Sequence, residues 1–283
     1  MMPILLIEQY ALEQRVVLGV CFSFLGLLII YYGLKTLEMA YVLKNKKPYF
    51  VHFYLRLKTL SHKEKSILSQ NFSFYNTLSK KHKKYFEHRV ALFIKDKDFV
   101  GAKNYMVTDK MRVLISATAV MLTFGFRDFY ISLLSKIVIY PKAFYSKMNK
   151  AYHKGEFNPK LKALVLSWED FEEGFKIEND NLNLGIHELT HAIHLNSIKE
   201  RDISSTIFKD SFSELTSLLS SKKELREKLI LSQYFRGYAY TNKFEFLAVI
   251  IENFIETPDE FKSEFPRIYN KVKQMLNFNM NGY

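Results

Sequence analysis

Cysteine is almost absent from this chain of 283 residues, which contains only Cys21. A single thiol cannot form a disulfide within the chain, so nothing in the cysteine content suggests an oxidising compartment. No internal repeat or low-complexity segment stands out. The length suits a single domain of about 240 residues with an anchor, or two small domains.

Charge is absent from the stretch Val16–Leu34 near the N-terminus. At about 1.5 Å per residue, a helix of this length spans nearly 30 Å, the thickness of a bilayer core. Tyr31 and Tyr32 stand near one end, as interfacial aromatic residues do. A buried core helix rarely runs so long without a charge. A signal peptide would need a basic start and a cleavage site, but no Lys or Arg precedes Arg15. The stretch therefore predicts one transmembrane helix.

Basic residues are scarce before this span and frequent after it. Arg15 precedes it, whereas Lys35, Lys44, Lys46 and Lys47 follow it. The positive-inside rule then places the large C-terminal part in the cytoplasm, with these lysines near anionic lipid headgroups. We expect a single-pass protein of the inner (cytoplasmic) membrane. The predicted organisation is an N-terminal segment (1–15), a transmembrane helix (16–34), a juxtamembrane linker (35–60) and a domain over residues 61–283.

The formal net charge is +12. A basic balance can indicate nucleic acid or anionic lipid as a partner. Here the lysines are spread along the chain, with short clusters at 44–47 and 80–84. Such runs are usually solvated faces, so nucleic-acid binding is not expected.

Helix signals dominate the chain after the span. Ser61 with Glu64 resembles a capping box. Thr108 or Asp109 can begin a helix within residues 107–126, whose apolar core is too short to cross a bilayer and is predicted to be central and buried. Further helices are predicted over residues 77–96, 199–232 and 241–256, with a last helix starting at Pro258.

Strand signals are few. Ile137–Tyr140 and Ala163–Ser167 are β-branched or apolar runs bounded by proline and charge, and they predict strands. The sequence therefore predicts an α+β fold, rich in helix, with one small sheet.

His187-Glu188-Leu189-Thr190-His191 has the pattern H-E-x-x-H. Two imidazoles four residues apart lie on one face of a helix, so both can reach one metal ion. Glu188 lies beside that face, close enough to take a proton from a metal-bound water but not placed as a ligand. Zinc prefers such nitrogen ligands and lowers the pKa of bound water to about 7. The motif therefore predicts a water-activating zinc centre, whose usual reaction is peptide hydrolysis.

The residues around the motif are mostly apolar. Residues 182–195 interleave apolar side chains with the histidines, and Asp180 or Asn181 can cap the helix. A mostly apolar helix is buried, and buried histidines need partners. Two solvated histidines on a surface helix are therefore the weaker interpretation.

A catalytic zinc ion needs a third protein ligand. The metzincin pattern would require histidine where Ser197 stands, so that class is excluded. His194 lies about 10 Å along the helix from His187, too far for both to share one ion easily, and is expected to be a core or supporting residue.

A carboxylate from a later helix is the remaining option for the third ligand. Glu245 stands in an otherwise apolar helix start, where a charge is costly unless it is paired or metal-bound. The helix dipole or a lysine would explain Glu245 equally well. Spacing alone leaves three candidates open, namely Glu214, Glu245 and Glu252.

Five stretches of this sequence, in order, resemble the Mlc titration factor A family, also described as zinc-dependent or glucose-regulated metallopeptidases. The likeness covers roughly residues 60–278, nearly all of the chain after the span. The stretches are 108–125, 136–144, 164–174, 183–194 and 238–269.

The resemblance implies one zinc ion bound by His187, His191 and Glu245 in a gluzincin-like arrangement. It implies Glu188 as the general base. It also implies a role for Tyr238, seven residues before the glutamate ligand, in donating a hydrogen bond to the developing oxyanion. An ordinary packed aromatic is the alternative for Tyr238.

The chain also departs from the family pattern near the site. The family usually has Leu-Asp where Ile193-His194 stands, and commonly an acidic residue where Gly237 stands. The best-known members are soluble and cytoplasmic, without a membrane span. These changes bear on substrate preference and do not alter the ligands.

The sequence thus predicts a membrane-anchored zinc metallopeptidase that acts on peptides or proteins in the cytoplasm, as an aminopeptidase or an endopeptidase. The strand Ala163–Ser167 is expected to be an edge that binds an extended peptide by strand addition. The rival is a non-catalytic protein that sequesters a transcriptional regulator, as the family's name-giving member does. A membrane quality-control protease is disfavoured because there is one span.

Overall fold

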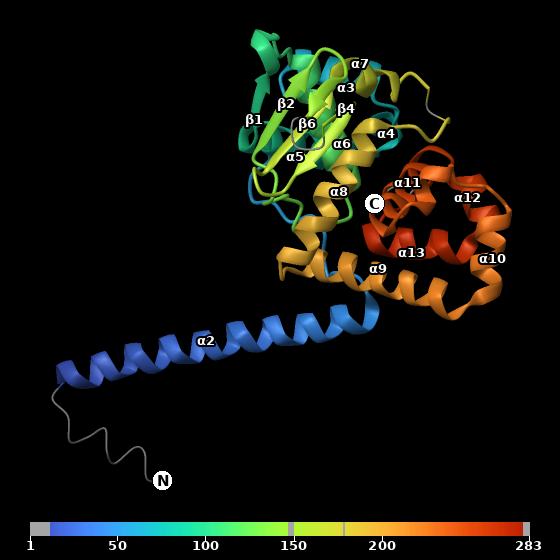
Figure 1. Ribbon diagram of the computed structural model, residues 1–283. Helices are drawn as coiled ribbons and strands as arrows, with labels where there is room; N and C mark the ends of the chain where they lie inside the picture. Colours follow the sequence, from blue (N-terminus) through green and yellow to red (C-terminus); the bar gives the residue numbers. More distant parts are fainter. Residues whose placement is uncertain (1–11, 147–149, 178, 280–283) are drawn as a thin grey trace. The chain divides into compact units, whose positions relative to one another are not determined.

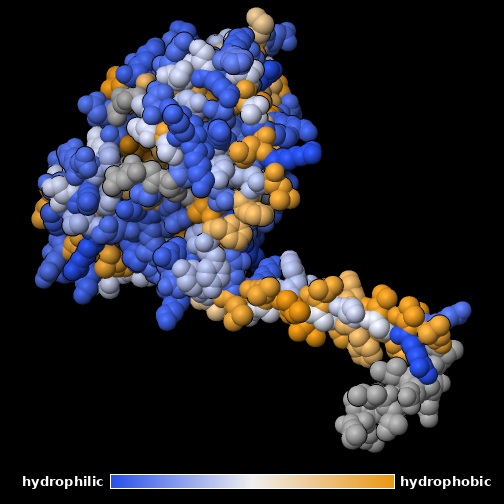
Figure 2. Space-filling model, turned by 180° about the vertical axis from the view of Figure 1, so that it is seen from behind, coloured by the Kyte–Doolittle hydropathy of each residue, from blue (hydrophilic) through white to orange (hydrophobic). Residues whose placement is uncertain are grey.

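In the computed structural model, the chain divides into two compact units, Met1–Tyr49 and Phe50–Tyr283. Residues 12–146, 150–177 and 179–279 are described (Figure 1). The first unit contains one long helix, α2 (Leu12–Asn45). By length and composition α2 could cross a membrane, and none of its most apolar 18-residue window is buried within the protein. Figure 2 shows apolar side chains along this helix and a mainly hydrophilic surface on the second unit.

The second unit is rich in helix, as predicted. Ser61 and Glu64 form the expected capping box, and Thr108 caps the predicted central helix, which is almost entirely buried. The last helix was predicted as one, but Pro266 divides it, because proline begins a new helix more readily than it continues one. The helices are α3 (His62–Asn71), α4 (Ser73–Thr77), α5 (Lys80–Asp96), α6 (Asp109–Leu122), α7 (Trp168–Glu173), α8 (Leu184–Lys199), α9 (Ile203–Ser221), α10 (Lys223–Leu231), α11 (Lys243–Glu256), α12 (Pro258–Glu264) and α13 (Pro266–Leu276), with the short 3-10 helices η1 (Ala102–Asn104) and η2 (Gly237–Tyr240).

The small sheet has the strand order β1-β2-β6-β5. β1, β2 and β6 are parallel, and β5 pairs antiparallel with β6. A separate two-stranded sheet pairs β3 with β4. The predicted strands at residues 137–140 and 163–167 are confirmed. The strands are β1 (Asp98–Gly101), β2 (Lys136–Tyr140), β3 (Phe144–Ser146), β4 (Ala151–His153), β5 (Gly155–Asn158) and β6 (Ala163–Ser167).

The prediction that Ala163–Ser167 forms the edge of the sheet is wrong. This strand, β6, pairs with β2 on one side and with β5 on the other, so its backbone groups are already used. The described edge on this side of the sheet is β5, which the sequence did not reveal because Gly155 and Asn158 are poor strand formers.

Helix α8 connects the two halves of the second unit. It contacts β5, β6 and α6 on one side and α9 and α11 on the other. Figure 1 shows it between the sheet and the C-terminal helices. Its apolar residues, such as Ile186, Leu189 and Ala192, join the same hydrophobic core as the apolar residues of α11. This packing holds the polar side chains of α8 in fixed positions between sheet and helices.

Candidate active site

Helix α8 begins one turn before the H-E-x-x-H motif. The Asn183 side chain caps it by accepting a hydrogen bond from the backbone N–H of Ile186 at 3.1 Å. The caps predicted at Asp180 and Asn181 are therefore wrong. Asp180 instead accepts a hydrogen bond from the N–H of Leu182, and Asn181 has a left-handed backbone with φ of 56°. Helix α8 therefore begins two or three residues later than the sequence predicted.

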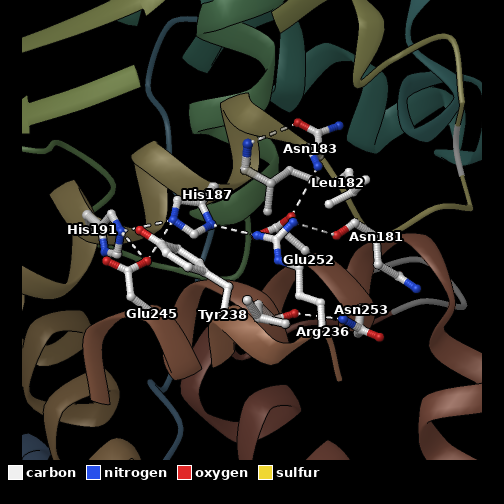
Figure 3. A network of polar contacts seen from close by, with 12 residues as sticks. Asn181, Leu182, Asn183, His187, His191, Arg236, Tyr238, Glu245, Glu252 and Asn253 are labelled. Carbon is white, nitrogen blue, oxygen red and sulfur yellow. Dashed lines mark hydrogen bonds and ion pairs between the residues drawn. The ribbon is translucent and has the colours of Figure 1, made fainter. Parts of the chain in front are cut away.

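His187 and His191 lie one above the other on the same face of α8, as the four-residue spacing predicts. Their Nε2 atoms are 3.2 Å apart. Glu245 of α11 faces them, with its Oε2 atom 3.0 Å from Nε2 of His187 and 3.5 Å from Nε2 of His191 (Figure 3). One ligand atom from each of the three residues lies within 4.8 Å of the other two. We call these three residues the metal-ligand group.

The metal-ligand group fits a divalent ion of the zinc type. Two nitrogens bound tetrahedrally to one zinc at roughly 2.05 Å are roughly 3.3 Å apart, close to the separation of the two imidazole nitrogens here. Two imidazoles and one carboxylate are also a donor set that catalytic zinc uses with a fourth position left for water or substrate. The residues therefore suit a metal that activates water.

Helix α11 brings Glu245 to the histidines from its first turn. Asn242 caps α11 by accepting hydrogen bonds from the N–H groups of Phe244 and Glu245. Burial would raise the pKa of the Glu245 carboxyl, but hydrogen bonds from His187 and His191 outweigh burial and hold this pKa below its ordinary value. Glu245 is therefore an ionised carboxylate, the form that a metal ion requires.

Glu188 follows His187 on α8, lies against strand β5 and lines the same cleft as His187. It is buried, and a Cβ atom on Gly155 would lie 2.5 Å from its Cγ atom. Position 155 must therefore be glycine for Glu188 to keep this place. Burial raises the pKa of Glu188 above its ordinary value, while the charges of His187 and His191 act in the opposite direction. A carboxyl with a raised pKa is a stronger base than an exposed one.

The other ring nitrogen of His187 is held by Glu252, which is fully buried. Nδ1 of His187 is 2.6 Å from Oε1 of Glu252. Arg236 donates to the same oxygen at 2.7 Å, and the N–H of Asn183 donates to Oε2 at 3.1 Å. Glu252 therefore accepts a hydrogen bond from Nδ1 of His187 and orients the ring, so that Nε2 faces His191 and Glu245 (Figure 3).

The two glutamates also set the charge on His187. Burial would lower the pKa of His187, but hydrogen bonds with Glu245 and Glu252 raise it to about 9. A metal ion must therefore displace a proton from Nε2, so metal binding at this group releases a proton.

The remaining candidates from the sequence lie elsewhere. Glu214 forms an ion pair with Lys271 at 2.6 Å. Glu252 contacts Nδ1 of His187, whereas the ligand group is formed at Nε2, so Glu252 is not placed as a ligand beside His191. His194 is buried, and its ring packs against Phe212 and Phe244, with centroid distances of 4.8 and 5.0 Å. His194 is thus a core residue, as expected.

Tyr238 stands at the mouth of the site on η2. Its ring centroid is 5.9 Å from that of His187, and half of the residue is exposed. Burial and the nearby carboxylates of Glu245 and Glu188 raise the pKa of its phenol. The phenol therefore keeps its proton at neutral pH and can donate a hydrogen bond into the site.

Sequence reasoning missed Arg236 and Gly155. Arg236 could have been sought, because a glutamate inside an apolar helix such as α11 needs a charged partner. Gly155 carried no local signal, since its role depends on β5 meeting α8. The position of Glu252 behind His187 was also not foreseen, although Glu252 was considered as a ligand.

A cleft of about 430 Å³ opens beside His187 and Glu188. Its walls come from β4 and β5, from α7 and the following loop, from α8 and from the η2 segment. Charged side chains line much of it. Among them are Lys154, Asp170, Glu173, Asp180 and Arg236.

Comparison with known proteins agrees with this geometry. A sequence profile of the family described as glucose-regulated metallo-peptidase M90 matches residues 45–277. An uncharacterized protein of Synechocystis sp. (strain PCC 6803), slr2042, is 23% identical over 223 residues, which cover 74% of this chain and 81% of the relative. The resemblance inferred from the sequence motifs is confirmed. A metallopeptidase family implies a metal, and the group of His187, His191 and Glu245 could bind one. The chain therefore belongs to the family of glucose-regulated metallo-peptidases M90.

Proposed function

We propose that this chain is a zinc-dependent peptidase of the gluzincin type, with His187, His191 and Glu245 as ligands and Glu188 as general base. The observation that carries the proposal is the convergence of the three ligand atoms within 4.8 Å, beside a buried glutamate and a cleft. When bound, zinc supplies a Lewis acid that lowers the pKa of water and polarises a carbonyl group.

Glu188 moves the proton in this proposal. It takes a proton from the attacking water and passes it to the nitrogen of the leaving amine. Its burial against Gly155 raises the pKa of its carboxyl and so strengthens it as a base. Tyr238 donates a hydrogen bond to the oxyanion that develops on the scissile carbonyl. The position of its ring, 5.9 Å from that of His187 between centroids, supports this role.

Strand β5 is the surface on which we expect the substrate to lie. It is the described edge of the sheet next to β6, and Gly155 places it directly beside Glu188. An extended peptide that adds to this edge would pass its backbone across the site. This arrangement moves the peptide-binding role from β6, where the sequence suggested it, to β5.

Helix α2 is proposed to anchor the enzyme in the membrane. Its uncharged stretch and its exposed apolar residues suit hydrocarbon. The lysines that follow the span favour an orientation with the peptidase on the cytoplasmic side. External protease acting on intact cells should leave the region after Lys47 undigested, and digestion there would reverse this orientation.

The test of the function is hydrolysis by zinc-loaded Glu188→Gln protein. The amide keeps the shape of the side chain but cannot take a proton at neutral pH. Turnover of a peptide substrate should fall roughly a hundred- to ten-thousand-fold, with zinc content unchanged. Glu173→Gln is the matched control, because Glu173 is an exposed carboxylate in the same cleft, and it should retain turnover. Unchanged cleavage by metal-replete Glu188→Gln protein would contradict the mechanism.

A further inference from the structure

A second pocket of about 290 Å³ lies beside His191 and Glu245. The pocket shares His191 and Glu245 with the metal-ligand group. A group that occupies it therefore lies next to the position where the bond is cut. Its lining residues are Phe157, His191, Leu195, Asn242, Phe244 and Glu245.

Three apolar side chains from three different elements form the walls of this pocket. Phe157 comes from β5, Leu195 lies one helical turn beyond His191 on α8, and Phe244 comes from the first turn of α11. The Phe244 residue is 42% exposed, and Phe157 and Leu195 are partly exposed. Apolar surface that stays in contact with water in a cleft gains free energy when an apolar ligand group covers it.

The Phe244 wall has a firm support. Its ring packs on that of His194 at 5.0 Å, and His194 is buried against Phe212. The backbone of α11 at this point is fixed by the Asn242 cap. The pocket is therefore formed before a substrate arrives, which lowers the cost of filling it.

The cleft beside Glu188 and the pocket beside His191 differ in character. The cleft carries charges such as Lys154, Asp170 and Arg236. The pocket is walled by Phe157, Leu195 and Phe244. A peptide that lies across the site thus meets a charged environment on one side of the scissile bond and an apolar one on the other.

Strand β5 contributes to both the cleft and the pocket. Gly155 stands against Glu188, and Phe157, two residues further on, lines the apolar pocket. Residues two apart on a strand point to the same face. A substrate aligned along β5 therefore presents a side chain toward Phe157 about two residues from the bond that faces Glu188.

We propose that the pocket of Phe157, Leu195 and Phe244 selects peptides with a large apolar side chain within two residues of the scissile bond, on the side of His191. This inference rests on the proposed peptidase function and names its substrate class. Aromatic and long aliphatic residues should be preferred there, and charged residues should be rejected because the pocket would remove them from water.

The experiment uses the full-length, zinc-loaded protein and a peptide library in which one position is varied at a time. Cleavage sites are identified by mass spectrometry, and kcat/KM is measured for matched peptides with Phe, Leu, Ala or Asp at the selected position. The kcat/KM for peptides with Phe or Leu should exceed that for the Ala peptide by about tenfold or more, and that for the Asp peptide by a still larger factor. Peptide binding to the Glu188→Gln protein, followed by fluorescence anisotropy, should show the same order without any turnover.

Variants assign the preference to the pocket. Phe244→Ala should reduce the ratio of kcat/KM for Phe and Ala peptides to about a third of the wild-type ratio or less. Phe244→Met keeps an apolar wall and should retain most of the wild-type ratio. Leu182→Ala is the matched control, because Leu182 is an exposed apolar residue that lines the charged cleft and not the apolar pocket. It should leave the ratio unchanged. Melting temperatures measured in parallel confirm that each variant is folded.

The outcomes separate this inference from the proposed function. Cleavage that depends on Glu188 but shows no apolar preference would overturn the inference and leave the peptidase intact. An equal loss of preference in Leu182→Ala and Phe244→Ala would also overturn it. If zinc-loaded wild-type protein cleaves no peptide in the library, the proposed function fails, and the inference fails with it.

Discussion

Helices α2 and α8 are both largely apolar, but they meet opposite environments. In α2, the most apolar 18-residue window has no part buried within the protein. In α8, even the polar side chains of His187, Glu188, Thr190 and His194 are buried. Apolar composition alone therefore does not determine whether a helix lies in the core or outside it. A helix with no charged group in its middle suits hydrocarbon, whereas a helix with buried charged and polar groups requires partners from elsewhere in the fold.

The partners of α8 come mainly from one other helix. Glu245 and Glu252 of α11 lie on opposite sides of His187, one at Nε2 and one at Nδ1. The function of α8 should therefore be sensitive to single changes in α11. The chemistry should be insensitive to α2. The following experiments test this contrast, beginning with the largest expected effect.

Glu245→Ala should abolish zinc binding at stoichiometric metal and reduce hydrolysis to background. The two histidines would keep their places on α8, but two ligands hold zinc far more weakly than three. Zinc content by atomic absorption and peptide turnover are the measurements. Glu214→Ala is the control, since Glu214 pairs with Lys271 instead. Full zinc and activity in Glu245→Ala protein would mean that the third ligand is another residue.

Tyr238→Phe should lower kcat by roughly a hundred- to a thousand-fold, the usual effect of removing one oxyanion donor. The loss should fall on kcat more than on KM, because the hydrogen bond matters mainly in the transition state. Zinc content should stay the same. Turnover within about threefold of wild type would show that Tyr238 is only a packed aromatic.

Glu252→Gln should weaken zinc affinity by about ten- to a hundred-fold, because the carboxylate that orients His187 and accepts its Nδ1 proton is lost. Competition with a chelator measures this affinity. Glu256→Gln, one turn further along α11, should leave zinc affinity nearly unchanged. Among the described residues, Glu256 forms no hydrogen bond with either histidine. Equal effects of the two variants would argue against the orienting role of Glu252.

Glu256 should also make the stability of the fold depend on pH. Burial, together with the charges of Glu252 and Asp180, raises the pKa of Glu256 from an ordinary value of 4.5 to about 7. The unfolded chain therefore releases this proton at lower pH than the folded chain does. The stability of the wild type relative to Glu256→Gln should fall as pH rises from about 4.5 to about 7, and should change little above that. Urea midpoints for both proteins at about pH 5 and pH 8 would measure this difference, and a difference that does not vary with pH would contradict the assignment.

Deletion of residues 1–45 should have the smallest effect on chemistry. The unit from Phe50 to Tyr283 has its own core, so zinc content and kcat should stay within about twofold of the full chain. The protein should move from the membrane fraction to the soluble fraction. A truncated protein that loses zinc would show that α2 and the site are not separable.

The sequence predicted α8 and its histidines because the spacing of a helix is local. The same reasoning could not choose between Glu245 and Glu252. They are seven residues apart on one face of α11, and only the packing of α11 against α8 decides which carboxylate meets Nε2. The family resemblance selected Glu245, and the geometry brings that residue to both histidines.

The parts of the site that the sequence did not reveal depend on contacts between distant segments. Strand β5 has little strand propensity and forms because β6 offers it an edge. Gly155 is needed because Glu188 occupies the space of a side chain there. Asn183, rather than Asp180 or Asn181, caps α8 because the loop makes a left-handed turn at Asn181.

The most direct test of the central claim is zinc titration of chelator-treated protein. The account predicts that peptide hydrolysis is absent without metal, rises linearly with added zinc and reaches its maximum at one equivalent per chain. Loss of His191 or Glu245 should remove this response, because both belong to the metal-ligand group. Hydrolysis that persists in the metal-free protein, or that requires no member of this group, would contradict the account.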